Sequence, residues 1–406
     1  MLSDEVLDKV IERLVLRIEE GNTYTLKKIG QTINKIRDIP PSDVHRLNQI
    51  LENGGDYDKI VKKLAEITKL NEQEIYEIFE EVAKKDYQFA EQFYKYRNKK
   101  YIPYEFNKQL QEQVKAIAKV TADEYINMSR TLAFSKKVNG KVVYSEIGTA
   151  YQEIIDKAIM SVGQGKETFN DQLRQSIVEL GRSGLKTVDW ESGTSRRLDS
   201  AVRMHLKAGL KNLHNEMQLE LGKEFDSNGV EVSVHQHPAP DHEQVQGRQF
   251  SNDEFNKFQN DEDSVDITGK KFPAISEETK QDRRAIGQYN CYHYVFSIII
   301  GVNEPQYTEE QLQEIIDDNE KGFDYGGKHY TLYEGTQLQR RIETAIRKEK
   351  DAQIIAKAGG FDDEVQDAEK NINSLLKEYV EVSKISGLPT KMDRLKVDGY
   401  KQVPIT

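Results

Sequence analysis

Histidine, cysteine and acidic side chains gather in the stretch from residue 235 to residue 293, which holds the only cysteine and four of the eight histidines. The side chains that could do chemistry there are His235, His237, Asp241, His242, Glu243, Cys291 and His293. Imidazole and thiolate are the ligands that zinc prefers in proteins. Residues two apart in a strand share one face, so the pairs 235/237 and 291/293 could together supply four ligands. These residues could therefore form a structural zinc site with His235, His242, Cys291 and His293 as its ligands.

Other interpretations of these residues stay open. A lone cysteine beside an apolar strand is often only a small buried side chain, and the neighbouring His-Pro and Pro-Asp-His stretches could tie a loop through hydrogen bonds. A metal-dependent hydrolase or nuclease could use Glu243 as general base, but no HExxH pattern is present. Cys291 as a nucleophile would need a base, and His293 is poorly placed to take the proton. Because the sequence also has no GxxxxGK[ST] loop and no GxSxG elbow, we predict no enzyme.

The composition restricts the kind of protein further. The chain has 406 residues, which is enough for two to four domains, and a net charge of -11. A protein that binds nucleic acid along its whole surface would carry the opposite charge. A single cysteine excludes an internal disulfide framework. The N-terminus has no apolar signal-peptide core, and the best apolar run, 294–302, is far too short to span a bilayer.

Helical patterns dominate the first half of the chain. Residues 1–95 should form a bundle of short helices, used as an interaction module, with Gly21 ending the first helix and Pro40-Pro41 starting the second. Asn71 and Glu74 have the spacing of a capping box between two further short helices.

Residues 96–225 should form a long-helix domain. Apolar residues recur with helical spacing over 110–132 and 198–217, and Asn139-Gly140 between valines predicts a hairpin. His205 and His214 on the second of these helices are most simply core or flank residues.

The composition changes after residue 225. Over 226–305 we expect a small α+β core with the His/Cys cluster, in which 230–234 alternates like a half-buried strand and 294–300 is a strand buried on both faces. An acidic irregular stretch, 253–266, should separate the two strands.

The last quarter, 306–406, should hold C-terminal helices and an extended arm. Thr308 should cap a helix, two longer helices should follow over 334–358 and 365–379, and the arm should begin after Gly387. The expected fold class is mainly α, with elongated helical domains around a small mixed α+β central domain.

Three sets of residues, in the right order, resemble a known family. They are Ser192-Gly193 with Arg196, Leu198, Asp199, Ala201, Val202 and Arg203; then His235, Pro240-Asp241-His242, Gln246-Gly247, Asn290-Cys291, His293, Gly301 and Glu304-Pro305; then the run from Tyr330-Thr331 through Gln339-Arg340 to Lys350. Together they resemble the minor capsid protein 2 family of tailed bacteriophages, which is similar to the head-morphogenesis proteins typified by phage Mu protein F. The resemblance covers about residues 145–400. The chain departs from the family pattern at Ala239 and Tyr292, where arginine is usual, and at Val245, where tryptophan is common.

The resemblance implies a structural virion component of the phage head, made in the cytoplasm of the infected bacterium. Such a protein would lie near the portal vertex in several copies and assist head assembly, DNA packaging or ejection. Its partners would be the portal and capsid proteins, close to packaged DNA and away from any membrane. We also predict a local basic surface at Arg340, Arg341, Arg347 and Lys348, either a solvated helix face or a contact with the portal or DNA.

Overall fold

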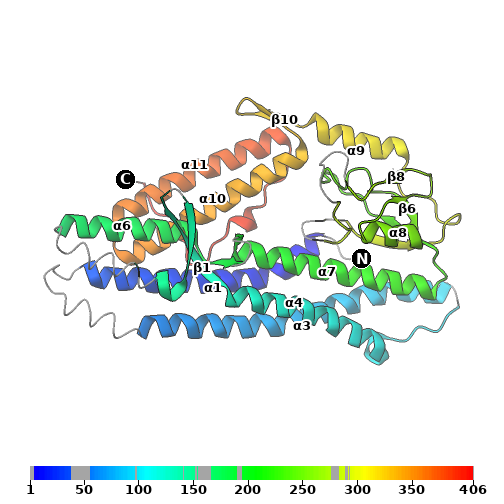
Figure 1. Ribbon diagram of the computed structural model, residues 1–406, viewed down its shortest axis with the longest axis horizontal. Coiled ribbons are helices and arrows are strands. Elements are labelled where there is room, and N and C mark those ends of the chain that lie inside the picture. Colours follow the sequence, from blue (N-terminus) through cyan, green and yellow to red (C-terminus); the bar gives the residue numbers. More distant parts are fainter. Residues whose placement is uncertain are drawn as a thin grey trace. The chain divides into compact units, whose positions relative to one another are not determined.

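The protein is mainly helical with small antiparallel sheets, as a computed structural model shows (Figure 1), and this confirms the expected fold class. The structure describes residues 4–37, 55–96, 98–139, 141–150, 153, 166–189, 194–275, 283–288, 291 and 293–405. The helix expected after Pro40-Pro41 lies outside these residues. Among the described helices, none combines the length and the apolar character needed to cross a membrane.

The chain divides into two compact units built from alternating segments. Unit 1 comprises Met1–Ile11, Ile75–Ala122 and Met204–Gln337, and unit 2 comprises Glu12–Glu74, Asp123–Arg203 and Leu338–Thr406. The boundaries between the units fall inside helices. The four consecutive domains expected from the sequence divide the chain differently, and that division stays a prediction.

Unit 2 consists of helices around one four-stranded sheet. The helices that lie wholly or partly in it are α1 (Asp4–Arg37), α3 (Gly55–Tyr96), α4 (Lys108–Arg130), α6 (Lys166–Ser183), α7 (Leu198–Glu224), α10 (Leu332–Gly359), α11 (Asp362–Ser386) and the 3-10 helix η3 (Met392–Leu395). Its strands are β1 (Leu132–Val138), β2 (Lys141–Glu146), β3 (Lys186–Val188) and β4 (Ser195–Arg197). They are antiparallel in the order β2-β1-β3-β4. Val138 pairs with Lys141, which confirms the hairpin predicted at Asn139-Gly140.

The core of unit 2 draws on segments that are far apart in the sequence. It joins apolar side chains from α1, α6, α10 and α11 with Phe134 of β1 and Val397 of the C-terminal segment. Gly21 does not end the first helix, because α1 runs on to Arg37. A side chain at Gly21 would lie 3.0 Å from Cδ1 of Ile67, so the glycine lets α3 pack closely against α1.

Asn71 and Glu74 also have a different role from the one expected. The two short helices predicted around them are one helix, α3, and both residues lie well inside its length rather than at an end. Nη1 of Arg17 donates to Oδ1 of Asn71 at 2.8 Å and to Oε2 of Glu74 at 2.6 Å. The capping-box spacing was therefore misleading, since the same polar residues serve a contact between α1 and α3.

The segment after Gly387 is largely extended, as expected, but it is no free arm. Leu395 and Val397 are buried, and Oγ1 of Thr23 donates to the carbonyl oxygen of Asp398 at 2.7 Å. The hydroxyl of Tyr400 donates to the Glu369 carboxylate. This segment is thus buried in part and hydrogen-bonded to side chains of α1 and α11.

Unit 1 combines parts of the long helices with the small α+β core. Its further elements are η1 (Tyr104–Phe106), β5 (Gly229–Val232), β6 (Gln249–Ser251), α8 (Asn252–Gln259), β7 (Ser264–Val265), β8 (Lys271–Phe272), β9 (Val295–Ile298), α9 (Glu309–Lys321), β10 (Phe323–Tyr325) and β11 (Lys328–Tyr330). Thr308 caps α9 through a capping box with Gln311, as predicted. β10 and β11 form a hairpin at the Gly326-Gly327 turn.

The sheet that positions the His/Cys cluster has the order β6-β5-β9 and is antiparallel. Both predicted strands are confirmed, but every residue of β5 is buried rather than alternate ones. Glu231 accepts a hydrogen bond from the Gln249 amide at 2.8 Å, which permits its burial. The acidic stretch expected to be irregular contains α8, which Ser251 caps and which buries Phe255 and Phe258 against the sheet.

Buried charges join three helices of unit 2 at Arg197. Its guanidinium lies 2.8 Å from Oδ2 of Asp351 on α10, 3.1 Å from Oδ1 of Asp199 on α7 and 3.4 Å from Oε1 of Glu19 on α1. Arg347 also pairs with Asp199, at 3.0 Å. We call these five residues the Arg197 cluster. A buried charge is tolerated only when it is paired, so the cluster fixes the mutual positions of these helices.

We expect Arg197→Met to lower the free energy of unfolding of the full chain by about 3–5 kcal/mol, because it leaves buried carboxylates without their partner. The control is Arg182→Met, which removes an ion pair with Glu349 whose arginine side chain is 46% exposed. That change should cost at most about 1 kcal/mol. Urea unfolding followed by circular dichroism measures both. Equal losses in the two variants would contradict the structural role of the cluster.

The cluster also predicts a dependence of stability on pH. Burial raises the pKa of the Glu19 carboxyl well above its usual range, and Asp199 and Asp351 add to this more than Arg197 opposes it. The unfolded chain then releases this proton at lower pH than the folded chain does. Stability should therefore fall as the pH rises from the usual glutamate pKa toward the raised one.

Glu19→Gln should remove this contribution and make the free energy of unfolding flatter with pH in that interval. Urea unfolding at several pH values measures the slope. Glu20→Gln on the exposed side of α1 is the control and should leave the slope unchanged. A slope that is the same in the natural chain and in Glu19→Gln would show that the carboxyl is ionised in the folded chain over that interval.

Candidate metal centre

Three of the four predicted metal ligands lie together in unit 1. They are His242, Cys291 and His293, all buried, and their ligand atoms lie within 4.8 Å of one another. Sγ of Cys291 is 3.6 Å from Nδ1 of His293. The rings of His242 and His293 are nearly perpendicular, with centroids 5.3 Å apart. The structure therefore brings three of the four predicted residues together, and their role as metal ligands stays a prediction.

The sheet brings the two halves of the site together. Cys291 and His293 directly precede β9, and His242 lies in the turns that follow β5. β5 pairs with β9, with Val232 opposite Val295. Beyond the last pair, the amide of Ser233 donates to the carbonyl oxygen of Tyr294 at 2.8 Å. Antiparallel pairing thus places the end of one strand beside the start of the other.

The tautomer of His242 follows from its partner. Nε2 lies 2.7 Å from the backbone carbonyl oxygen of Arg284, which can only accept a hydrogen bond. Nε2 therefore carries a proton, and in the neutral ring Nδ1 carries an electron pair. Nδ1 is buried and has no hydrogen-bond partner among the residues that the structure describes. Arg284 is itself fixed by two hydrogen bonds to the Asp241 carboxylate, at 2.6 and 2.7 Å.

The tautomer of His293 is set by Gln246. Oε1 of Gln246 accepts the backbone N–H of His235 at 2.9 Å, and this identifies the amide oxygen. Nε2 of His293 lies 3.3 Å from the same oxygen and must donate to it. Nδ1 of His293 is then the nitrogen without a proton, and it is the one that faces the sulfur of Cys291.

The sulfur of Cys291 lies in a setting that favours the thiolate. Burial by itself would raise the pKa of the Cys291 thiol, but the neighbouring His242 and His293 imidazoles outweigh it and hold that pKa well below its usual range. The backbone N–H groups of Gly287 and His293 point at the sulfur, at 3.3 and 3.4 Å. Lys211 donates to the Cys291 carbonyl oxygen at 3.0 Å and so fixes the backbone there.

The fourth predicted ligand, His235, is not among the converging atoms. Its Nδ1 accepts the backbone N–H of His237 at 3.1 Å, and its ring centroid is 6.3 Å from that of His293. Glu243, the general base of the hydrolase alternative, is buried and accepts a hydrogen bond from the Asn319 amide at 3.0 Å. That contact ties it to α9 rather than to the cluster.

The four predicted basic residues on α10 differ in exposure. Arg347 is buried in the Arg197 cluster and also donates to the carbonyl oxygen of Arg394 at 2.7 Å. Arg341 is exposed, whereas Arg340 and Lys348 are half-buried. Burial lowers the pKa of Lys348, and nearby Arg197 lowers it further. A contact of these residues with the portal or with DNA stays a prediction.

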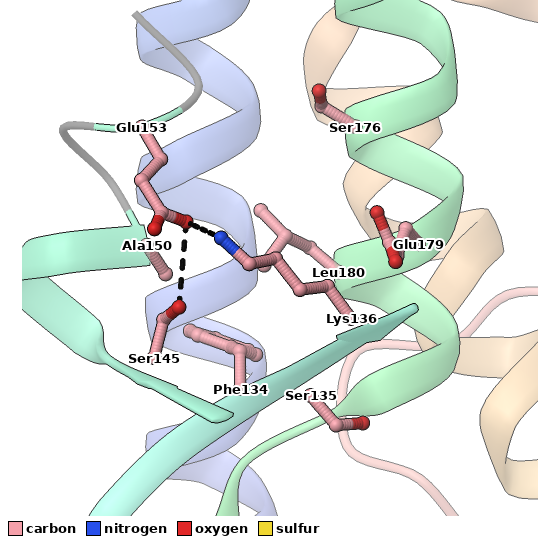
Figure 2. A pocket seen from close by; sticks show the side chains of 9 residues that line it. All are labelled: Phe134, Ser135, Lys136, Ser145, Ala150, Glu153, Ser176, Glu179 and Leu180. Atoms are coloured by element: carbon pink, nitrogen blue, oxygen red, sulfur yellow. Dashed lines mark hydrogen bonds and ion pairs between the residues drawn. The ribbon is translucent and has the colours of Figure 1, made fainter. Parts of the chain in front are cut away.

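A second polar hollow lies in unit 2, between β1, β2 and α6. Figure 2 shows Lys136 reaching toward Glu153, with which it forms an ion pair, while Oγ of Ser145 lies 3.3 Å from the same carboxylate. The rest of the hollow is lined by Phe134, Ser135, Ala150, Ser176, Glu179 and Leu180. Because the lysine and the carboxylate neutralise each other, this set offers no activated base or nucleophile, and the His/Cys site remains the stronger candidate.

Sequence reasoning missed several side chains that support the site, chiefly Lys211, Gln246 and Arg284. Gln246 belonged to a recognised motif, so its presence near the site could have been expected. Lys211 lies on α7 and Arg284 in an irregular segment, and neither has a spacing that links it to the cluster. Only the folded chain brings them to the site.

Comparison with known proteins agrees with the motifs. The family described as phage minor capsid protein 2 matches residues 2–381. This chain therefore belongs to the phage minor capsid protein 2 family, and it is a structural component of the phage head that associates with other virion proteins. No curated protein and no solved structure matches it significantly.

Arg284→Leu tests whether the Asp241–Arg284 pair holds the turns at His242 in place. It should leave the largely buried Asp241 carboxylate unpaired and cost about 3 kcal/mol or more of stability. Amide hydrogen exchange should then quicken over 239–248. Lys257→Leu, which removes an exposed pair with Glu254, is the control and should leave exchange at 239–248 unchanged. Equal exchange over 239–248 in both variants would show that the Asp241–Arg284 pair does not hold the turns at His242 in place.

Proposed function

We propose that this chain acts close to the portal vertex, where it assists head assembly, DNA packaging or ejection. The observation that carries the proposal is the family match over nearly the whole chain. In this proposal several copies are made in the host cytoplasm and built into each virion. Their partners are the portal and capsid proteins, with packaged DNA nearby, and the role is structural rather than catalytic.

The surface chemistry supports protein contacts over extensive binding of DNA. The net charge is -11, and binding along the phosphate backbone would require the opposite sign. The exposed face of α3 in unit 1 carries acid–base pairs such as Glu80–Lys84 and Glu81–Lys85, at 3.0 and 2.7 Å. Such pairs solvate a helix and leave little net positive charge for DNA. Unpaired apolar side chains such as Phe106, which is 77% exposed, suit a protein partner better.

The basic residues of α10 supply one specific contact to test. With Arg347 engaged in the Arg197 cluster, we propose that Arg340 and Arg341 make the contact with an acidic surface of the portal. Both lie on the same helix in unit 2, and Arg341 is exposed.

The chain should be present in purified virions, in far fewer copies than the major capsid protein, and the purified chain should bind the isolated portal oligomer. Mass spectrometry of particles and a pull-down on portal measure the two. The double variant Arg340→Glu/Arg341→Glu should weaken portal binding by roughly tenfold or more, since rim charges are reversed. The control is Lys377→Glu on the exposed face of α11, which reverses one positive charge. This variant should bind the portal as the natural chain does.

Absence of the chain from intact particles would overturn the structural role. Presence in particles without portal binding would remove the vertex assignment alone. Cleavage of DNA or of a peptide by the purified chain would instead favour the hydrolase or nuclease alternative.

A further inference from the structure

The His242–Cys291–His293 site has more electron pairs than protons. In their neutral forms His242 and His293 each carry an electron pair on Nδ1, because their Nε2 atoms donate to Arg284 and Gln246. The only proton available among the three ligand atoms is that of the Cys291 thiol. One proton can join the sulfur to one imidazole, and the other Nδ1 is left buried and unpaired. An unpaired buried acceptor is costly, so this arrangement needs a further positive centre.

The separation of the ligand atoms fits a metal ion. Zinc binds sulfur at about 2.3 Å and imidazole nitrogen at about 2.0–2.1 Å, so two such ligands of a tetrahedral ion lie roughly 3.5 Å apart. The Cys291 sulfur and Nδ1 of His293 are 3.6 Å apart. That distance is also long for a neutral hydrogen bond to nitrogen, and all three ligand atoms fall within 4.8 Å.

We propose that Nδ1 of His242, Sγ of Cys291 and Nδ1 of His293 bind one zinc-type divalent cation that stabilises the fold. A thiolate with two imidazoles selects zinc or a similar transition metal, whereas Mg²⁺ and Ca²⁺ require oxygen ligands. This proposal concerns the chain by itself and does not depend on its place in the phage head.

The surroundings of the three ligands have the form that metal sites use. Histidines that bind metals usually donate their other ring N–H to a carbonyl or carboxylate, which fixes the tautomer and the orientation of the ring. Here the Arg284 carbonyl does this for His242, and the Gln246 amide oxygen does it for His293. Two backbone N–H groups point at the Cys291 sulfur, as suits a thiolate.

Metal content of the purified full chain is the first test. Chains produced with zinc present should carry one zinc per chain, and the chelated chain reloaded with cobalt(II) should show the absorption of a thiolate–cobalt bond. Because Cys291 is the only cysteine, that absorption reports on this site alone. Zinc should also protect the thiol from alkylation, and chelation should restore the reaction.

Variants separate the three proposed ligands from the neighbouring histidines. Cys291→Ser should abolish the cobalt band, and His242→Ala should abolish stoichiometric binding. His235→Ala should keep both, because His235 lies outside the ligand set. His329→Gln is the matched control, since that histidine is exposed and pairs with Asp324.

Natural chain without stoichiometric zinc, without a cobalt band and with equal alkylation before and after chelation would overturn the proposal. These measurements need no variant, so a variant that fails to fold does not affect them. Loss of metal from His235→Ala would overturn the three-residue ligand set. None of the outcomes depends on portal binding, so they are distinguishable from failure of the proposed function.

Discussion

The arrangement of unit 2 depends on one buried guanidinium, that of Arg197. It is 5% exposed and faces carboxylates from three helices that are distant in the sequence. Asn22 extends the contact, because its amide donates to Asp351 at 3.1 Å and accepts the backbone N–H of Leu185 at 2.9 Å. Apolar packing tolerates small displacements, but an ion pair removed from water does not. The charges and the apolar core of unit 2 therefore act together on the positions of these helices.

The α+β core of unit 1 is held by polar contacts in the same way. Its strands have two to four residues, so ladder hydrogen bonds are few and side chains satisfy much of the backbone. Arg283 shows this most fully. Its guanidinium donates to the carbonyl oxygens of Phe272, Pro273, Phe258 and Glu262 and stacks 3.7 Å from the centroid of the Phe258 ring. Side chains such as Arg283 thus supply partners for backbone carbonyl groups that the short strands leave outside their ladders.

The sequence was sufficient for the features that depend on periodic apolar patterns and on turn chemistry. Helices α4, α7, α10 and α11, the Asn139 hairpin, strands β5 and β9 and the Thr308 cap were all predicted, whereas α1 and α3 were expected as shorter helices. Errors arose where a residue has two uses. Gly21 can end a helix or admit a neighbouring one, and only tertiary contacts decide between them. At the site, three of the four residues chosen from their types, His242, Cys291 and His293, lie together in the structure. The supporting residues Lys211 and Arg284 were missed, because their contacts arise only on folding.

The His/Cys site joins two parts of the chain that are separated by several elements. His242 precedes the excursion that contains β6, α8, β7 and β8, and Cys291 follows that excursion. A contact between them closes the excursion at its base. A cross-link that closes a long segment restricts the unfolded chain more than one that closes a short segment. Arg284 places a cation on Asp241 from another part of the chain and so fixes the turns that carry His242. A contact that joins the two ends of so long a segment is consistent with a structural purpose.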